Sequence, residues 1–480
     1  MQLLALTADI DGLTVTGDAE TDIRGLTADS RAVQPGYLFA ALPGLKLDGR
    51  TFIGDAIAKG AAAILTTHDV SANAPIIATK NPRRALAQLA AQFYGAQPDT
   101  IAAVTGTNGK SSTVDFCRQI WKKAGPHAAS MGTIGTVTDA GLRKGSLTTP
   151  DPVSLQENVA QLAKEGITHL ALEASSQGMH QYRLDGLKIK IAGFTNISRD
   201  HLDYHGSMEA YFSAKLYLFT QLLHKDGTAV INADSDAAEK VLAACHGRQT
   251  ITYGHAGKDI RILSQTPEPA GQYLSLEIFG TPHDVHLPLV GAFQAENALC
   301  ALGMVLAEQN IAQDKAITAL TSLKSVRGRL ELAGTINDAA VYVDYAHTPD
   351  GLETMLHALR PHTHGKLRVV FGCGGDRDKG KRPMMGEIAV RLADDAIVTD
   401  DNPRTENAKA VRADIMTAAK GAREIGERRT AIFEGIKSLE PGDVLVIAGK
   451  GHEQGQIIGR DILPFDDVTE AKKAIKEISG

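Results

Sequence analysis

The sequence has little of what marks a membrane protein, a disulfide-stabilised protein or a nucleic-acid-binding protein. Its 480 residues contain no apolar run near the ~20 residues that span a bilayer, and the acidic segment Met1–Glu20 lacks the basic flank of a signal peptide. One tryptophan and a net charge of −6 give no reason to expect nucleic acid. We therefore expect a cytoplasmic protein without a membrane or nucleic-acid partner.

Cysteine is scarce and scattered. No two cysteines form a Cys-x-x-Cys pair, so neither a disulfide framework nor a zinc site is indicated. We expect small buried apolar side chains at Cys117, Cys245, Cys300 and Cys373.

Length and composition favour several globular α/β domains. A chain of 480 residues exceeds a single core, and 43% hydrophobic with 22% charged residues is ordinary for a globular protein. Apolar strand-like runs alternate with helical stretches, which predicts mostly parallel sheets covered by helices. In the first region we expect strands within 37–42 and 62–66 and a helix at 52–59. The expected domains are residues 1–88, 89–325 and 326–480.

The segment Gly106–Ser112 is the strongest local motif. The apolar run Thr100–Val104 is typical of a buried strand, and a helix is predicted over Thr113–Lys123. In a strand–loop–helix unit, backbone N–H groups and the helix N-terminus bind a polyphosphate, while the motif's lysine and hydroxyl reach the terminal phosphates and Mg²⁺. Val104 occupies the place of the first Walker glycine, so the loop is a compressed Gly-x-x-Gly-Lys-Ser form. A plain turn before a helix is the competing interpretation.

Polar residues follow two further strands of the central region. Glu173 ends the run 167–173, and Asn196, Asp200 and His201 follow the run 189–196. Because ligands gather at the carboxyl ends of parallel strands, these groups predict a Mg²⁺ or catalytic site, although His201 could simply cap a turn.

Lys215 interrupts an apolar helical stretch, 211–219. Such a lysine usually extends to solvent, but one held in an apolar site can have a lowered pKa and take up CO₂ as a carbamate.

Four apolar strands of the third region end in charged loops, as in an open α/β sheet with a binding edge. These loops begin near Asp344, Gly374, Asp400 and Gly449. A dinucleotide site is not expected, because the Gly-x-Gly-x-x-Gly spacing is missing. We interpret the charged segment Arg423–Arg429 as a solvated helix end.

Together these motifs resemble the Mur ligase family, ATP-dependent amide-forming synthetases of peptidoglycan precursors. The resemblance spans nearly the whole chain and favours the members that add the third amino acid. It implies a small α/β UDP-binding domain, a central P-loop domain with a mostly parallel sheet, and a C-terminal Rossmann-like α/β domain. The segments that carry it are Asp29–Arg31, Gly106–Ser112, Thr148–Pro150, Glu173–Gly178, Asp344–Asp350, Gly374–Asp378 and Gly449–Glu453.

The resemblance also implies roles for residues of the first two regions. Catalysis and metal binding would involve Ser111, Lys110, Glu173, His201 and Lys215, the last as a carbamate, with Mg²⁺. ATP would contact Gly106, Thr107, Asn108, Gly109, Lys110, Ser111, Ser112, Asn297, Arg329 and Asp344. The UDP-linked muramoyl dipeptide would contact Ala28, Ser30, Leu45, Lys46, Leu47, Thr148, Thr149, Ser175, Gln181 and Arg183.

In the third region, the segment Asp401–Arg404 resembles the motif of enzymes that add meso-diaminopimelate. An arginine can pair with the distal carboxylate of that amino acid, which L-lysine lacks. The implied contacts are Arg377, Asp401, Asn402, Pro403, Arg404, Gly449 and Glu453. The resemblance thus implies joining of meso-diaminopimelate to UDP-MurNAc-L-Ala-D-Glu through an acyl phosphate, by a monomer.

Three alternatives stay open at this point: an L-lysine-adding ligase, a ligase like folylpolyglutamate synthase, and a nucleotide-dependent switch without bond-forming activity. Ser111 and Ser112 keep the hydroxyl of the threonines frequent in the family. Gln177 stands where histidine is common, and Gln294 replaces a usual asparagine, which puts the adenine contacts in question.

Overall fold

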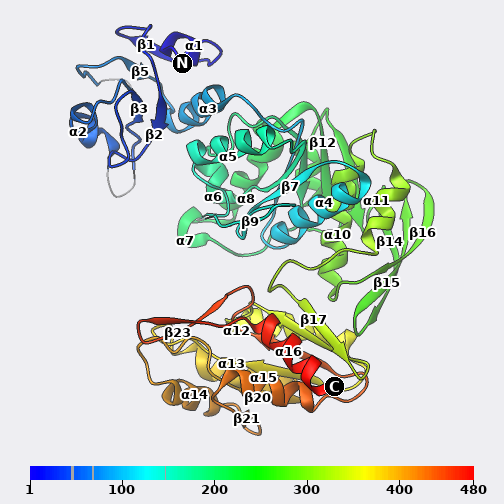
Figure 1. The fold of residues 1–480 in the computed structure, drawn as a ribbon. Helices are drawn as coiled ribbons and strands as arrows, with labels where there is room; N and C mark the ends of the chain where they lie inside the picture. The colour runs from blue at the N-terminus through cyan, green and yellow to red at the C-terminus, as the bar shows by residue number, and fades with distance from the viewer. Residues whose placement is uncertain (45–47, 68–69, 146, 480) are drawn as a thin grey trace. The chain divides into compact units, whose positions relative to one another are not determined.

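The computed structural model describes residues 1–44, 48–67, 70–145 and 147–479. The chain separates into two compact units, one of Met1–Ile260 with Leu299–Ala316 and one of Arg261–Ala298 with Ile317–Gly480. Both units contain parallel strands and packed helices, as the sequence predicts (Figure 1). Across the described ranges, every helix is too short or too polar to cross a bilayer.

The first unit opens with a small α/β layer. Its sheet has the strand order β1-β5-β4-β3-β2, in which only the edge strand β1 runs antiparallel to its neighbour. Both strands and the short helix expected here are present. The elements are α1 (Leu3–Thr7), β1 (Thr14–Thr16), β2 (Gly25–Thr27), β3 (Tyr37–Ala40), η1 (Gly49–Phe52), α2 (Ile53–Ala58), β4 (Ala63–Thr66), β5 (Ile76–Ala78) and α3 (Pro82–Tyr94).

The second sheet of this unit carries the strand after which the phosphate loop begins. Its order is β13-β12-β11-β6-β10-β7-β8-β9, and the strands from β13 to β7 run parallel. The central strands β6 and β10 are buried along their whole length. The strand elements are β6 (Thr100–Thr105), β7 (Ala128–Gly132), β8 (Gly135–Thr138), β9 (Gly141–Arg143), β10 (His169–Glu173), β11 (Ile189–Phe194), β12 (Leu223–Asn232) and β13 (Gln249–Gly254).

Helices complete this layer. The helix after the phosphate loop starts at Lys110, three residues before its predicted start, because Gly109 provides the left-handed turn that opens it. The stretch around Lys215 is α-helical to Tyr217 and then widens into a π-helical turn. The helices are α4 (Lys110–Ala124), α5 (Pro152–Lys164), α6 (Ser176–His180), α7 (Leu202–His205), α8 (Met208–Tyr217), η2 (Leu218–Leu222) and α9 (Ala238–Ala244). The residues of α10 (Ala292–Leu306) and α11 (Gln313–Leu320) are divided between the two units.

The second unit contains β14 (Ile260–Glu268), the antiparallel pair β15 (Gly271–Ile278) and β16 (Thr281–Leu287), and a larger sheet of order β17-β18-β22-β19-β20-β21. From β18 to β21 that sheet is parallel, and the antiparallel β17 forms its edge. Its strands are β17 (Glu331–Ile336), β18 (Ala339–Asp344), β19 (Leu367–Phe371), β20 (Asp395–Val398), β21 (Arg423–Glu424) and β22 (Val444–Ala448).

Helices bury both faces of this sheet, which explains the continuous apolar strands in the sequence. Adjacent residues point to opposite faces, so Val369 joins one hydrophobic cluster and Val370 the other. One cluster includes side chains of α12 (Pro349–Leu359), α13 (Lys381–Leu392) and α14 (Ala408–Met416), and the other includes those of α15 (Arg428–Lys437) and α16 (Asp467–Ser479). The remaining elements are η3 (Arg360–His362), β23 (Gly455–Ile458) and β24 (Asp461–Pro464).

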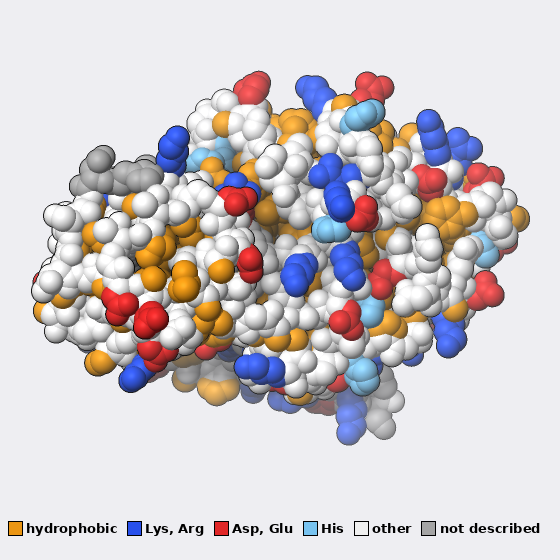
Figure 2. Space-filling view, turned by 90° about the horizontal axis from the view of Figure 1, so that it is seen from above, with side chains coloured by type: hydrophobic (Ala, Val, Ile, Leu, Met, Phe, Trp, Pro, Cys, Tyr) orange, Lys and Arg blue, Asp and Glu red, His pale blue; other side chains and the backbone are white. Residues whose placement is uncertain are grey.

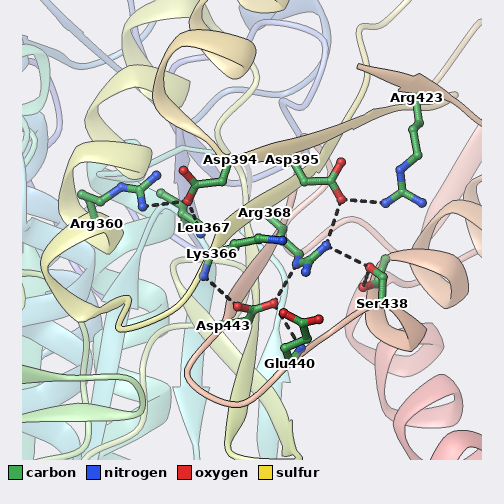
Figure 3. A network of polar contacts seen from close by, with 11 residues as sticks. Arg360, Lys366, Leu367, Arg368, Asp394, Asp395, Arg423, Ser438, Glu440 and Asp443 are labelled. Carbon is green, nitrogen blue, oxygen red and sulfur yellow. Dashed lines mark hydrogen bonds and ion pairs between the residues drawn. The ribbon is translucent and has the colours of Figure 1, made fainter. Parts of the chain in front are cut away.

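At the amino end of this sheet a polar network joins the starts of four strands, β19, β20, β21 and β22 (Figure 3). Arg368 bonds Asp443 at 2.8 Å and Asp395 at 3.1 Å, and Asp395 also accepts from Arg423 at 2.7 Å. The backbone N–H groups of Lys366 and Glu440 donate to Asp443. The network therefore ties the strand starts together.

The interpretation of Arg423–Arg429 as a solvated helix end is wrong for part of that segment. Residues 423–424 form β21, and Arg428 is fully buried, with its guanidinium paired to the equally buried Asp467 at 2.7 Å. Arg428 also donates to the carbonyl of Ala448 at 3.0 Å. Elsewhere, on the face shown in Figure 2, basic and acidic side chains are interspersed rather than gathered by sign.

Candidate active site

The phosphate loop follows the buried strand β6. Gly106 has φ +156° and Gly109 has φ +86°. A Cβ atom at Gly106 would lie 1.9 Å from Thr195 Oγ1, so a larger residue would displace the neighbouring strand end. Close packing therefore requires glycine at position 106, and the left-handed backbone favours it at position 109.

The end of β11 holds this loop in place. The Thr107 N–H donates to the Asn196 carbonyl at 2.9 Å, and the Asn108 N–H donates to Asn196 Oδ1 at 2.9 Å. Thr195 Oγ1 donates to the Asn108 carbonyl at 2.6 Å. The loop is thus fixed in front of the N-terminus of α4, whose first N–H groups and dipole favour an anion.

Two lysines converge on one carbonyl of the loop. Lys110 Nζ donates to the carbonyls of Gly106 and Thr107, both at 2.9 Å, and Lys215 Nζ donates to the Gly106 carbonyl at 2.7 Å. Lys215 is 1% exposed and its Nζ lies 4.3 Å from the centre of the Tyr211 ring. The structure thus excludes the solvent-extended interpretation of this lysine.

Burial lowers the pKa values of both amines. Burial and the nearby charge of Lys110 lower the pKa of Lys215 to about 6. Burial also lowers the pKa of Lys110, although the carboxylates of Glu173 and Asp200 oppose the shift. At neutral pH Lys215 is therefore mainly an uncharged amine, which is the form that reacts with CO₂.

Ser111 and Glu173 supply a pair of oxygen ligands next to the loop. Ser111 Oγ donates to Glu173 Oε1 at 2.8 Å, and the Thr133 N–H donates to the same oxygen at 2.8 Å. Glu173 is 2% exposed and pairs in register with Val104 of β6. Hydroxyl and carboxylate oxygens are ligands that Mg²⁺ prefers, so this donor pair fits the ion that the sequence predicts.

The side chain of His201 contacts Asp200 and Tyr211 rather than the oxygen pair of Ser111 and Glu173. It starts α7 with φ +52°, and its Nε2 is 3.5 Å from Asp200 Oδ2, both side chains being about half exposed. Its ring centre is 6.0 Å from that of Tyr211, the residue under Lys215. Over the described ranges, no three His, Cys, Asp or Glu side chains gather as a metal-ligating group.

The residues expected to bind the muramoyl dipeptide form a connected set. Thr149 Oγ1 donates to the Glu173 carbonyl at 2.8 Å and lies 3.0 Å from Ser175 Oγ. Arg183 donates to the Thr149 carbonyl at 2.7 Å and to Gln181 Oε1 at 2.8 Å. Thr148 Oγ1 joins the set through Thr133 Oγ1, 2.9 Å away.

Gln181 and Arg183 also line a cavity of about 620 Å³ within the first unit. Its other walls include Ala28 and Asp29 of the small α/β layer and Arg83 of α3. Ser30 uses its carbonyl to accept from Lys59 Nζ at 2.8 Å. The expected contacts Leu45, Lys46 and Leu47 lie outside the described residues. Burial lowers the pKa of Arg183 but leaves it a cation, so the cavity presents a fixed positive charge.

In the second unit, Lys450 organises the residues expected to bind the amino acid. It is fully buried, donates to Asn402 Oδ1 at 2.9 Å and lies 3.3 Å from Glu453 Oε2. Asn402 Nδ2 donates to the same Glu453 oxygen at 2.8 Å. Asp401 is 3.7 Å from Lys450 Nζ, and its Oδ1 has no hydrogen-bond partner. Burial raises the pKa of Asp401, and Arg428 and Lys450 oppose that shift.

Arg404 lies at the edge of this cluster. Its Nη1 donates to the Gly375 carbonyl at 2.8 Å, and a Cβ atom at Gly374 would lie 2.6 Å from Nη1. Gly374 thus leaves room for the guanidinium. Pro403, the residue before Arg404, is buried, as is Gly449 after β22, whereas Arg377 is exposed on its loop.

The residues expected to contact the nucleoside also lie in the second unit, and each has different neighbours. Asn297 Nδ2 donates to Gln294 Oε1 at 3.1 Å, so the unusual glutamine is a direct neighbour. Asp344 accepts from the N–H groups of Leu330 and Ala346, and burial raises its pKa against those two hydrogen bonds. The Arg329 guanidinium lies 5.0 Å from the centre of the Tyr345 ring.

Sequence reasoning missed several residues that hold the site. Thr133 follows the end of β7 and bonds Glu173, and its position after a strand was an available signal. Tyr211 Oη lies 3.2 Å from Thr107 Oγ1 of the phosphate loop and its ring faces Lys215. Lys450 stood inside a motif already identified, but its burial and its contact with Asn402 depend on the fold.

Comparison with known proteins adds three family matches. The Mur ligase family, catalytic domain, matches residues 22–94; the Mur ligase middle domain matches 104–305; and the Mur ligase, glutamate ligase domain, matches 328–451.

Similar proteins extend over nearly the whole chain. A UDP-N-acetylmuramoyl-L-alanyl-D-glutamate--2,6-diaminopimelate ligase of Caulobacter vibrioides is 53% identical, covering 95% of this chain and 96% of its own. A ligase of the same name from Zymomonas mobilis is 50% identical over 94% and 95%. A solved structure of such a ligase has a TM-score of 0.80 and 34% identity, covering 100% of this chain and 99% of its own.

Proposed function

This chain belongs to the Mur ligase family, and we propose that it uses ATP to join meso-2,6-diaminopimelate to UDP-N-acetylmuramoyl-L-alanyl-D-glutamate. One observation carries the proposal. In the segments Asp401–Arg404 and Gly449–Glu453, the buried Lys450 is hydrogen-bonded with Asn402 and Glu453, and the Asp401 carboxylate lies 3.7 Å from its Nζ. The Arg404 guanidinium lies at the edge of this cluster, bonded to the Gly375 carbonyl. A substrate with both an ammonium and a carboxylate at its distal centre is complementary to such a cluster.

In the proposed reaction, the substrate's D-glutamate γ-carboxylate attacks the γ-phosphorus of ATP, and ADP leaves. The amine of diaminopimelate then attacks the carbonyl carbon of the acyl phosphate, loses a proton, and phosphate leaves as the amide forms. Lys110 stabilises the charge on the transferred phosphoryl group, and the loop N–H groups orient it. Arg183 pairs with a carboxylate of the dipeptide.

We assign Mg²⁺ to the oxygens of Ser111 and Glu173, assisted by His201 and by Lys215 as a carbamate. The ion, when bound, adds positive charge beside the ATP phosphates. The low pKa of Lys215 supports the carbamate, because an uncharged amine is needed to bond CO₂. The conversion would replace a neutral amine with an anionic oxygen ligand.

The alternatives differ in the amino acid or in the acceptor. An L-lysine-adding enzyme has no use for a guanidinium at the distal carboxylate, so Arg404 favours diaminopimelate. A folylpolyglutamate-type ligase needs no UDP site, whereas the 620 Å³ cavity beside Ala28 and Arg183 suits a nucleotide-linked substrate. A switch without bond formation needs no amino-acid cluster in the second unit.

We retain three functional regions in this proposal: 1–88 for the UDP moiety, 89–325 for ATP, and 326–480 for the amino acid. The expected boundary at residue 88 falls inside α3 (Pro82–Tyr94). We also retain the expectation of a cytoplasmic monomer.

Phosphate release with a panel of amino acids tests the proposal. We expect release only with ATP, UDP-MurNAc-L-Ala-D-Glu and an amino acid together, and a much higher kcat/KM for meso-diaminopimelate than for L-lysine or L-ornithine. Release that does not depend on the muramoyl dipeptide would overturn the ligase assignment. A preference for L-lysine would overturn the amino-acid assignment alone, and activity with a folate would support the rival acceptor.

A further inference from the structure

The proposed reaction makes no use of the hairpin formed by β23 (Gly455–Ile458) and β24 (Asp461–Pro464). Its strands pair with each other in a separate two-stranded sheet. The hairpin starts two residues after Glu453, and its first strand contacts the Asp401–Arg404 segment. Gln456 Nε2 donates to the Asp401 carbonyl at 2.7 Å, and the Ile457 N–H donates to Asn402 Oδ1 at 2.9 Å.

The same strand engages both backbone polar groups of Arg404. The Arg404 N–H donates to the Ile457 carbonyl at 3.0 Å, and the Gly459 N–H donates to the Arg404 carbonyl at 2.7 Å. Arg404 and Ile458 thereby form an isolated parallel bridge. Arg404 has φ +51°, a backbone conformation that is unfavourable for a residue other than glycine. These two bonds therefore stabilise Arg404 in that conformation.

The hairpin has little support of its own. Ile458, Ile462 and Leu463 are 46%, 70% and 49% exposed. An isolated two-stranded hairpin is at best marginally stable in water, so its contacts with the Asp401–Arg404 segment stabilise both partners. The order of the hairpin and the position of the guanidinium are therefore coupled.

We propose that the hairpin Gly455–Pro464 is a specificity-positioning element, which fixes Arg404 so that its guanidinium meets the distal carboxylate of a diamino diacid. The identity of that substrate is taken from the proposed function. Arg404 touches the substrate, and the hairpin acts through Arg404. Loss of the hairpin contact should therefore weaken selection of the distal carboxylate and leave binding of ATP unchanged.

Gly459→Pro is the strong test. Proline cannot adopt φ +62° and lacks the N–H that bonds Arg404, so the turn must move. Gly421→Pro is the matched control, because Gly421 is also left-handed, with φ +91°, and a Cβ at either glycine meets open space. Gln456→Ala is a milder variant that removes the bond to the Asp401 carbonyl and leaves the turn intact.

We expect Gly459→Pro to raise KM for meso-diaminopimelate by up to about tenfold, the loss expected when the Arg404 side chain is removed, and to lower its kcat/KM advantage over L-lysine by a similar factor. KM for ATP should stay within twofold, and Gln456→Ala should raise KM for the diamino acid about fivefold. In an Arg404→Ala background, Gly459→Pro should change KM less than threefold, since the positioned group is gone. Equal effects with and without Arg404, or equal losses for both amino acids, would overturn the proposal.

Amide hydrogen exchange separates this inference from the proposed function, because it needs no turnover. The peptide that contains Arg404 should exchange at least tenfold faster in Gly459→Pro than in wild type or Gly421→Pro. Unchanged exchange overturns the positioning role even if the enzyme uses diaminopimelate. Faster exchange in an enzyme that turns over only L-lysine supports the coupling of hairpin and Arg404 but overturns the selection of a distal carboxylate.

Discussion

At the amino end of the C-terminal sheet (Figure 3), Arg368 pairs with two aspartates and Asp443 accepts bonds at both carboxylate oxygens. At the carboxyl end, Asp401 has one buried oxygen without a hydrogen-bond donor, 3.7 Å from Lys450 Nζ. Both ends bury charge, but only the amino end satisfies it completely. A buried polar group without a partner costs free energy, and the variants below test whether a ligand supplies the missing contact at Asp401. Under the proposed function, the contrast is between charges that hold the fold and charges that we assign to substrate binding.

Lys215→Ala tests a buried site residue of the first unit and should have the largest effect on activity. We expect kcat to fall about 10³-fold, or ~4 kcal/mol, since a proposed electrostatic stabiliser of the phosphoryl transfer is lost. Added small carboxylates should restore part of the activity by replacing the carbamate. Lys190→Ala, at an exposed lysine on β11, is the control. A fully active Lys215→Ala would refute the metal-ligand role.

The same variant has a pH signature. Because the folded pKa of Lys215 is about 6 and its ordinary value is 10.5, the unfolded chain binds one more proton between those limits. The free energy of unfolding of the wild type should therefore rise with pH across this window, in CO₂-free buffer, relative to Lys215→Ala. Denaturant titrations at several pH values measure the difference.

Arg368→Met tests the amino end. Removing the guanidinium leaves the buried Asp443 without its cation, so we expect about 3 kcal/mol of destabilisation in urea unfolding. KM for diaminopimelate should not change. Arg391→Met, which breaks the half-exposed pair with Glu353, should cost less than about 1 kcal/mol. An equal loss in both variants would remove the distinction between buried and exposed pairs.

Asp401→Asn and Asp443→Asn compare the two ends directly. Asp401→Asn should weaken use of diaminopimelate by about 30-fold, or ~2 kcal/mol, without loss of stability, because a charged hydrogen-bonding partner of the substrate is removed. Asp443→Asn should do the reverse. If both substitutions acted mainly on stability, the carboxyl end would be structural as well.

The pH dependence of these two variants should have opposite signs. Burial raises the pKa of Asp401, so the wild type loses stability as pH rises from 3.8 to that raised value, and Asp401→Asn removes the loss. Burial alone would raise the pKa of Asp443, but hydrogen bonds from Lys366, Glu440 and Arg368 hold that pKa below its ordinary value. Its stabilisation is present above pH 3.8 and is lost as pH falls through the folded pKa.

Arg404→Ala should have the smallest effect. We expect a rise of about tenfold in KM for meso-diaminopimelate, or ~1.4 kcal/mol, and little change for ATP or L-lysine, because only the distal carboxylate loses its partner. Initial rates with each substrate varied in turn check this. Equal increases in KM for ATP and diaminopimelate would count against the assignment.

Local sequence patterns predicted the structural features that depend on residues close together in the sequence. The run Thr100–Val104 is a buried strand because its residues are apolar and β-compatible, and glycines open the helix after it. The parallel pairing of β18, β22, β19 and β20 agrees with the mostly parallel sheet predicted from the apolar runs, whereas their order in the sheet was not predicted. Such features depend on neighbours in sequence.

Features that depend on distant partners were not predictable in this way. Arg428 seemed solvated because its neighbours are charged, but its partner Asp467 is 39 residues away. The same holds for Gln456, which reaches the Asp401 carbonyl across 55 residues. The roles assigned to the site residues came from resemblance, and they stay predictions until the variants above are measured.

The four cysteines have a practical consequence. Cys117, Cys245, Cys300 and Cys373 are all buried, and burial raises the pKa of every one, to about 12 for Cys300 and Cys373. Because thiolates are the reactive form, maleimide dyes will modify the native protein slowly. A cysteine introduced at an exposed position in either unit can then be labelled selectively, which makes the wild-type sequence a ready background for site-specific fluorescence labelling.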